Sequence, residues 1–130
     1  MKTLLPPGWP RPKGYANAVS AIGRLIFTAG IIGWDEEERL VAPDLPGQLR
    51  QILLNTLAVL AEDGAGPEHV ARMTWYVVDV AEYRAGLAEI GAIYKAIMGR
   101  NYPAMAVVEV SGLVEPGARI EIETIAVVPE

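Results

Sequence analysis

Two glutamates near the end of the chain, Glu121 and Glu123, stand in a segment with the composition of a β-strand. Side chains alternate between the faces of a strand, so both carboxylates point the same way as Ile125 and Val127. A face that mixes carboxylates with aliphatic side chains suits a wet pocket or a subunit contact better than open solvent. The residues alone leave two interpretations of Glu121 open: a general base that activates water beside an apolar cleft, or an exposed surface carboxylate.

Other kinds of catalytic chemistry are limited by the composition. The chain has 130 residues and no cysteine, which excludes disulfides, zinc–thiolate sites, iron–sulfur clusters and thiol nucleophiles. His69 is the only imidazole, so a histidine metal site or a Ser-His-Asp triad would depend on it alone. It follows Pro67 and Glu68 in a turn, where we expect an exposed loop residue. Residues 64–66 lack the preceding strand and the following lysine of a phosphate loop. We expect no metal and no cofactor.

Charge and hydropathy narrow the classes of partner. The chain carries 16 acidic and 11 basic side chains, a net charge of −5, and the basic residues are scattered along the sequence. Because nucleic-acid binding depends largely on Lys and Arg that neutralise phosphates, we expect no nucleic-acid partner and no basic face. Residues 1–7 are too short and too rich in proline for a signal peptide, and no apolar run reaches membrane-spanning length. We expect a cytoplasmic protein without a membrane partner.

The amino-terminal half is expected to contain an arm, a hairpin and a helix. Residues 1–130 form a single domain, and prolines in residues 1–14 predict an extended arm. The short β-prone segments 18–21 and 25–29 predict a hairpin around Gly23. An apolar stripe at helical spacing then predicts the first helix, with Asp44 as its N-cap, Pro46 in its first turn and Gly64 as its left-handed end. The stripe consists of Leu45, Leu49, Ile52, Leu53, Thr56, Leu57 and Leu60.

The carboxyl-terminal half is expected to add one helix and three strands. Residues 72–79 are rich in β-branched and aromatic side chains and predict a buried strand. The second helix is predicted over residues 81–98, and Gly99 follows it. Segments 104–110 and 119–128 predict the last two strands, joined by a turn at residues 115–117. The order is β-β-α-β-α-β-β, an α+β fold with a mixed sheet. Two helices can cover only one sheet face, so the other meets solvent or another copy.

Five segments in this order and spacing resemble the YjgF/RidA family. Residues 14–19 resemble its GPYSQAV-like segment, and residues 27–32 resemble its FTSGQI-like strand end. Residues 48–55 carry Gln, Gln and Asn at the spacing found in the family's first helix. Residues 102–105 stand where the family has FPAR, and residues 119–126 match its closing VEIEAIA-like strand. The resemblance spans nearly the whole chain.

The resemblance implies a chorismate-mutase-like subunit, with two helices on one sheet face, and a homotrimer whose sheets form a central barrel. It also implies small-molecule clefts between neighbouring subunits. The family's best-understood members hydrolyse enamines and imines such as 2-aminoacrylate. By position, the residues implied to hold the ligand are Tyr15, Ala29, Gly30, Ile31, Gly91 and Met105. The implied catalytic residue is Glu121, which would position or activate water.

The chain departs from the family pattern at three of these positions. Met105 replaces the arginine that pairs with a substrate carboxylate, Ala29 replaces a serine, and Gly91 replaces an asparagine. Met105 is then either a soft pocket wall or plain core filling. The cations nearest in sequence to these motifs, Arg11, Lys13 and Arg100, either supply another anchor or lie solvated on the surface.

The pattern favours a divergent Rid-type hydrolase that acts on a small imine or enamine. The alternative is a non-catalytic trimer of the same family that binds a small ligand. A ribonuclease activity, attached to some family members, is disfavoured by the acidic balance of the chain.

Overall fold

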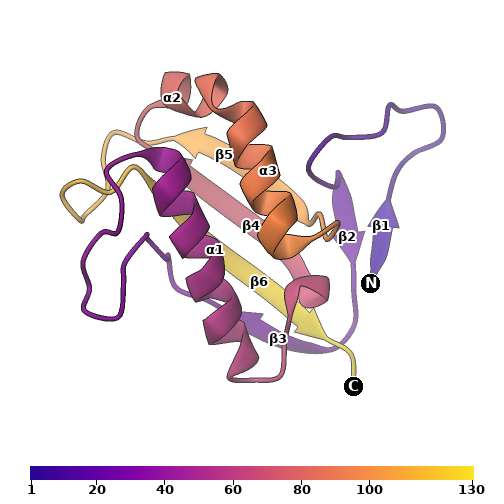
Figure 1. Ribbon diagram of the computed structural model, residues 1–130. Helices are drawn as coiled ribbons and strands as arrows, with labels where there is room; N and C mark the ends of the chain where they lie inside the picture. Colours follow the sequence, from indigo (N-terminus) through magenta and orange to yellow (C-terminus); the bar gives the residue numbers. More distant parts are fainter.

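Two sheets and three α-helices make up the fold in the computed structural model, which describes residues 1–130 (Figure 1). The elements are β1 (Lys2–Leu4), β2 (Ala18–Ser20), β3 (Arg24–Phe27), α1 (Leu45–Ala61), a 3-10 turn (Pro67–His69), β4 (Val70–Val77), α2 (Val80–Ala85), α3 (Leu87–Met98), β5 (Ala104–Glu109) and β6 (Ile120–Val128). Apart from the added strand β1 and a break in the second helix, this is the predicted order. The α+β class is confirmed.

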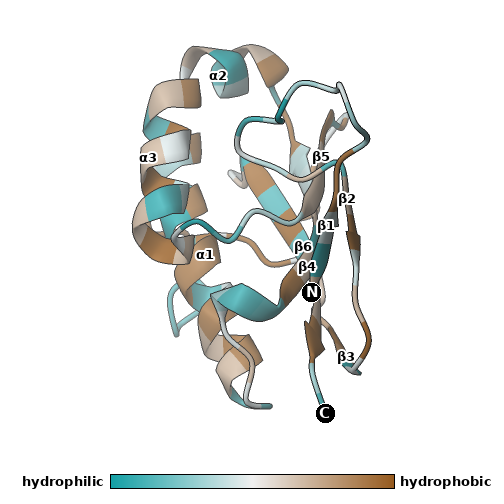
Figure 2. Cartoon of the chain, turned by 90° about the vertical axis from the view of Figure 1, so that its right-hand side faces the viewer, coloured by the Kyte–Doolittle hydropathy of each residue, from teal (hydrophilic) through white to brown (hydrophobic).

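The larger sheet has the strand order β3-β6-β4-β5. β4 and β5 run parallel because α2 and α3 carry the chain back between them, and the other neighbours are antiparallel. The sheet is therefore mixed, as predicted. α1 and α3 pack on one face of the sheet, and Figure 2 shows no helix on the other face.

The core lies between α1, α3 and the helix-facing side of the sheet. Its largest fully buried side chain is Trp75 of β4, beside Ile122 of β6 in the register. The predicted apolar stripe of α1 is buried there, with Leu45, Leu49 and Ile52 fully enclosed. Asp44 is the N-cap residue, as predicted, although its side chain makes no capping hydrogen bond.

The second helix is broken into α2 and α3, so the prediction of one helix over residues 81–98 is wrong. Asp79 caps α2, because its carboxylate accepts hydrogen bonds from the backbone N–H groups of Ala81 and Glu82. Gly86 then leaves helical geometry at φ −98° and ψ 11°. Glycine favours such a break because it gives up more conformational freedom in a helix than any other residue.

The predicted hairpin around Gly23 is also wrong. β2 pairs with β1, in the register Lys2↔Ser20, and β3 pairs with β6, in the register Ile26↔Ala126. The first residues therefore form a short strand within the predicted arm. This edge pairing of β3 packs Ile26 against the core. The remainder of the arm, residues 6–14, contains no helix or strand, in agreement with its prolines.

The sheet face opposite the helices exposes large apolar side chains. Phe27 is 67% exposed, Leu25 55% and Val108 43%. Between them, the Tyr76 hydroxyl donates a hydrogen bond to Glu123 Oε1 at 2.6 Å, and this bond raises the pKa of Tyr76 above its usual value.

No helix of the chain is both long and apolar enough to cross a membrane.

Candidate functional site

The site residues expected from the family pattern line two different cavities of the chain. Gly30, Ile31 and Glu121 line one cavity of about 300 Å³, which we call the Glu121 cavity. Tyr15, Gly91 and Met105 line a second cavity of about 400 Å³, which we call the Met105 cavity. Ala29 precedes the Glu121 cavity without lining it. The chain therefore brings the predicted residues together in two groups rather than one.

A β-bulge shapes the wall of the Glu121 cavity. The backbone N–H of Thr28 donates to the carbonyl of Thr124 at 2.9 Å, and Ile31 exchanges hydrogen bonds with Ile122 at 2.8 and 3.0 Å. Ala29 and Gly30 consequently stand opposite a single residue of β6, which is the two-against-one count of a bulge. Their backbone N–H groups donate to no group in the chain. The bulge leaves two amide donors available beside the cavity.

Glu121 lies directly against this bulge. A Cβ atom added to Gly30 would overlap Glu121 Oε2, so only glycine lets the carboxylate approach the backbone here. Glu121 is half-buried, and its carboxylate forms no hydrogen bond or ion pair within the chain. Glu123, two residues further on, is instead exposed and bonded to Tyr76. Of the two carboxylates, Glu121 is the one free to bind a water molecule or a proton.

The polar face of α1 positions the backbone around the Glu121 cavity. Gln48 is fully buried, and its side-chain amide donates to the carbonyls of Ala42 and Gly117 at 3.0 and 2.9 Å. Its Oε1 accepts the N–H of Arg119 at 2.7 Å, which fixes the start of β6 two residues before Glu121. Gln48, the first glutamine of the sequence motif, therefore positions Glu121 indirectly, through the backbone that its side chain binds.

Asn55 and Trp34 complete the wall of the same cavity. The Gln51 side chain donates to Asn55 Oδ1 at 2.7 Å, and Asn55 Nδ2 donates to the carbonyl of Trp34 at 2.8 Å. Asn55, Trp34 and Glu115 all line the cavity and are absent from the predicted site. The spacing of Gln and Asn in α1 was a signal for Asn55. Nothing in the sequence signals Glu115, because its position depends on how the turn before β6 folds.

The Met105 cavity is largely aromatic. The ring of Tyr94 stacks on Tyr102, with centroids 5.5 Å apart, and lies 6.3 Å from the ring of Trp75. Trp75 also meets Tyr83 edge to face at 6.4 Å. Burial raises the pKa of Tyr83 and of Tyr94 above the usual tyrosine value. Tyr83 and Tyr94 come from the segment predicted as the second helix, and none of Tyr83, Tyr94, Trp75 and Tyr102 was predicted as a site residue.

Met105 faces this aromatic cavity from β5. It stands beside Met73 of β4 in the parallel register and packs against the core, so it is both a pocket wall and core filling. Gly91 of α3 lies across the cavity, and a Cβ added there would meet nothing within 4 Å. Lys13, in the arm, is the only charged residue in the wall. The cavity suits an apolar ligand better than a small acid.

His69 is less exposed than predicted. Its side chain is 22% exposed, and its Nδ1 accepts the backbone N–H of Gly66 at 3.0 Å across the 3-10 turn. The imidazole therefore closes a turn. No group of three or more Asp, Glu or His side chains is placed to hold a metal ion.

The fold defines a class of protein through its likeness to solved structures. A member of the conserved Rid protein family from Yersinia pestis, YyfB, superimposes with a TM-score of 0.87 at 33% identity, covering 98% of each chain. RidA from an Antarctic Psychrobacter has a TM-score of 0.71 at 25% identity, covering 98% of this chain and 100% of its own. The class is that of the Rid proteins.

Sequence comparisons agree with the fold. A family model described as endoribonuclease L-PSP matches residues 10–128. A RutC family protein of Pyrococcus abyssi is 33% identical over 118 residues, which cover 90% of this chain and 89% of that protein. The 3-aminoacrylate deaminase RutC of Acinetobacter baylyi is 29% identical over 124 residues, covering 95% and 94%. The chain belongs to the endoribonuclease L-PSP family, the YjgF/RidA family.

Proposed function

We propose that the protein is a divergent Rid-type hydrolase that acts on a small reactive imine or enamine. The proposed site is a cleft between neighbouring subunits of a homotrimer. One subunit contributes the Glu121 cavity, and its neighbour contributes the Met105 cavity. Glu121 is the proposed catalytic residue, and Tyr15, Gly91 and Met105 form the proposed wall around the body of the substrate.

The separation of the two cavities carries this proposal. The Glu121 cavity has a free carboxylate and free amide donors, but it is the smaller of the two, and Trp34 is its only aromatic side chain. The Met105 cavity has a large aromatic wall but no carboxylate, and Lys13 is its only charged side chain. Each is half of a site, and a second copy of the chain would supply the missing half. The exposed Leu25, Phe27 and Val108 on the uncovered sheet face support burial against further copies.

The chemistry follows from the groups beside the bulge. Glu121 accepts a proton from water while the water oxygen bonds to the carbon of the C=N group. The proton moves to nitrogen, which gives a carbinolamine. The hydroxyl proton of the carbinolamine then passes to the amino nitrogen as the C–N bond breaks, which releases ammonia and leaves a carbonyl. The free N–H groups of Ala29 and Gly30 are suited to stabilising developing negative charge beside the carboxylate. The balance is one imine plus one water giving one carbonyl compound plus one ammonia.

The similarity to RutC supports the reaction class, because that relative is named a 3-aminoacrylate deaminase. The Met105 wall favours a different substrate, since Lys13 at the arm is its only cation and a carboxylate buried against the rings without a charged partner is costly. We therefore expect poor activity on small 2-imino acids and better activity on imines with a larger apolar body.

The same wall favours the second candidate, a non-catalytic trimer that binds a small apolar ligand. Met105 lacks the charge that would anchor a small acid beside the reacting carbon. In this alternative, Glu121 would hold a polar end of the ligand without turning it over.

Ammonia release from freshly generated imines separates the two candidates. The panel should pair 2-iminopropanoate with imines of larger apolar aldehydes and ketones. Release above the uncatalysed rate supports the hydrolase, and binding of the corresponding carbonyl compounds without release supports the alternative. Light scattering tests the assembly. Three copies of a 14.0 kDa chain give about 42 kDa, and a monomer mass at micromolar concentration would contradict the shared site.

A further inference from the structure

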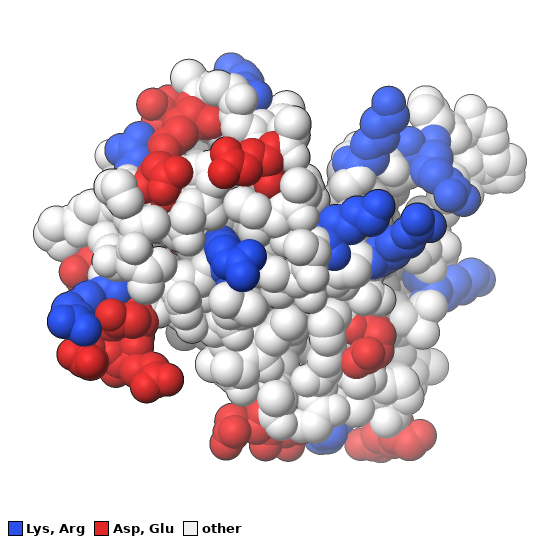
Figure 3. Space-filling model, in the orientation of Figure 1, with Lys and Arg blue, Asp and Glu red and all other residues white.

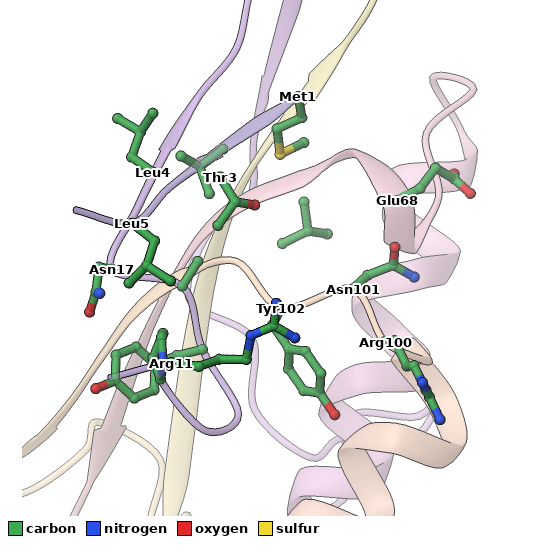
Figure 4. Close-up of a pocket in the computed structure, with 15 residues that line it drawn as sticks. Met1, Thr3, Leu4, Leu5, Arg11, Asn17, Glu68, Arg100, Asn101 and Tyr102 are labelled. Carbon is green, nitrogen blue, oxygen red and sulfur yellow. The ribbon is translucent and has the colours of Figure 1, made fainter. Parts of the chain in front are cut away.

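A third cavity adjoins the Met105 cavity and holds the cations that the aromatic wall lacks. It measures about 540 Å³ and lies between the amino-terminal arm and the loop that joins α3 to β5. Tyr15 and Tyr102 line both cavities, so the two are neighbours with these rings between them. Arg11 enters from the arm, and Arg100 belongs to the loop (Figure 4).

Neither arginine is used by the fold. Arg11 and Arg100 are both exposed, and neither makes an ion pair or a side-chain hydrogen bond within the chain. Figure 4 shows Arg11 extending toward Tyr102, whereas the side chain of Arg100 lies on the far side of that ring and points away from Arg11. The only acid in the wall, Glu68, lies with its Oε1 3.2 Å from His69 Nδ1. Both arginines of the cavity wall are therefore unpaired, and Arg100 would swing past Tyr102 to share an anion with Arg11.

The surface charge agrees with this local excess. Lys and Arg side chains gather over the arm and the adjacent end of α3, and most acids of this face lie elsewhere (Figure 3). The expectation of evenly scattered basic residues is therefore wrong for this face. The excess of positive charge arises because acids are absent from the arm. Elsewhere arginines are paired with acids, as Arg24, Arg39 and Arg119 lie within 4.0 Å of a carboxylate. The field favours an anion even though the net charge is −5.

We propose that Arg11 and Arg100 hold the carboxylate of an elongated substrate whose apolar body lies in the Met105 cavity. This inference rests on the proposed function, because it takes the Met105 cavity as the ligand site. The carboxylate passes Tyr15 and Tyr102 to reach the arginines, so it stands several bonds from the carbon that Glu121 of the neighbouring subunit attacks. The substrate class is an imine or enamine of a long apolar acid. A 2-imino acid, with adjacent carboxylate and C=N groups, is too short to use both cavities.

Calorimetry with saturated carboxylates tests the inference without requiring turnover. The probes are butanoate, hexanoate and octanoate, each paired with its neutral amide. Each added methylene that enters the aromatic cavity strengthens binding by about three- to fourfold. In the variant with Arg11→Ala and Arg100→Ala, octanoate binds about five- to thirtyfold more weakly, and octanamide binds as before.

A matched control removes two exposed arginines that line neither cavity, Arg50 and Arg84. The variant with Arg50→Ala and Arg84→Ala loses the same net charge and is expected to bind octanoate like the natural chain. Equal loss in both variants, or no loss in either, overturns the inference. So does salt-sensitive binding of single-stranded RNA that needs Arg11 and Arg100 while octanoate does not bind.

The inference and the proposed function fail separately. If the protein hydrolyses 2-iminopropanoate but binds no octanoate, the proposed hydrolase function is supported and the proposal of a long acidic substrate is wrong. Arginine-dependent octanoate binding without hydrolysis of any imine keeps the arginine site and selects the non-catalytic alternative.

Discussion

The two halves of the proposed site are built in different ways. The Glu121 half is fixed by backbone hydrogen bonds, because the bulge before Ile31 is clamped to β6 and Gln48 fixes where that strand starts. The Met105 half is built from side chains of β4, β5, α2, α3 and the arm, several of which meet through ring contacts. Substituting a side chain that only lines the cavity leaves the backbone hydrogen bonds of the first half intact, whereas it changes the second half directly. Reactivity therefore belongs to the rigid half, and substrate choice belongs to the half that sequence change can reshape.

Removing the carboxylate of the rigid half should have the largest effect. Glu121→Gln keeps the size of the side chain but cannot accept the proton of water, so turnover should fall about a hundred- to ten-thousandfold. Ligand affinity should change little. Steady-state ammonia release together with calorimetry checks both. Glu123→Gln is the matched control, because Glu123 shares the strand face but is bonded to Tyr76. Equal losses in the two variants would show that the carboxylates act only through the charge of the face.

Displacing the same carboxylate should have the next largest effect. Gly30→Ala places a Cβ where Glu121 Oε2 lies, so the flexible carboxylate must move away from the bulge. A displacement of this size should lower kcat by about ten- to a hundredfold with little change in melting temperature. Gly112→Ala is the control, because nothing lies within 4 Å of its added Cβ. Unchanged kcat in Gly30→Ala would mean that the bulge does not position Glu121.

In the aromatic half, a new cation should change specificity rather than reactivity. Met105→Arg supplies a partner for a carboxylate next to the C=N group, and hydrogen bonds to charged groups contribute about 1.5–3 kcal/mol. Activity on 2-iminopropanoate should rise about tenfold or more. Gly91→Asn should add to it, since the space beside Gly91 is open. Met105→Leu, which adds no charge, should give no gain. If the natural chain already hydrolyses 2-iminopropanoate as fast as a relative that has the arginine, this interpretation of Met105 is wrong.

The smallest expected effect is the response of the aromatic half to alkaline pH. Burial raises the pKa of Tyr83, so its neutral form is favoured in the folded chain. The contribution of Tyr83 to folding stability is therefore complete below about pH 10, the pKa of tyrosine in the unfolded chain, and is lost as pH rises through the pKa of the folded state. Denaturant unfolding across this range should show stability falling with pH. The fall should be shallower in Tyr83→Phe, and an identical slope would show that the ring is not protected by the cavity.

The sequence predicted the rigid half better than the aromatic one. Strand alternation placed Glu121 on the uncovered face, and helical spacing placed Leu45 and Ile52 in the core, because both depend on local periodicity. Two predictions were wrong: that β3 pairs with the preceding strand, and that one helix continues through Gly86. Strand pairing is decided by contacts between distant segments. A single glycine such as Gly86, within a segment that otherwise favours a helix, does not indicate whether the helix continues or ends.

The division of the site between two cavities was beyond the sequence for a related reason. Motif order says which residues belong to a family pattern, but it does not say which of them share a cavity within one chain. Tyr15 and Glu121 belong to one pattern and line different cavities. Only the folded chain shows that they lie apart, and the proposed assembly of neighbouring copies would join them.

Mixing two inactive variants tests the shared site most directly. Glu121→Gln disables one half, and Gly91→Trp fills the Met105 cavity from an open helix surface, so each protein alone should release almost no ammonia. When the two are unfolded together and refolded at equal amounts, each cleft draws its halves independently. About one half times one half, or a quarter, of natural activity should therefore return, from clefts that combine two intact halves. Activity no higher than the sum of the separate variants would show that both halves act within one chain, and would contradict the account.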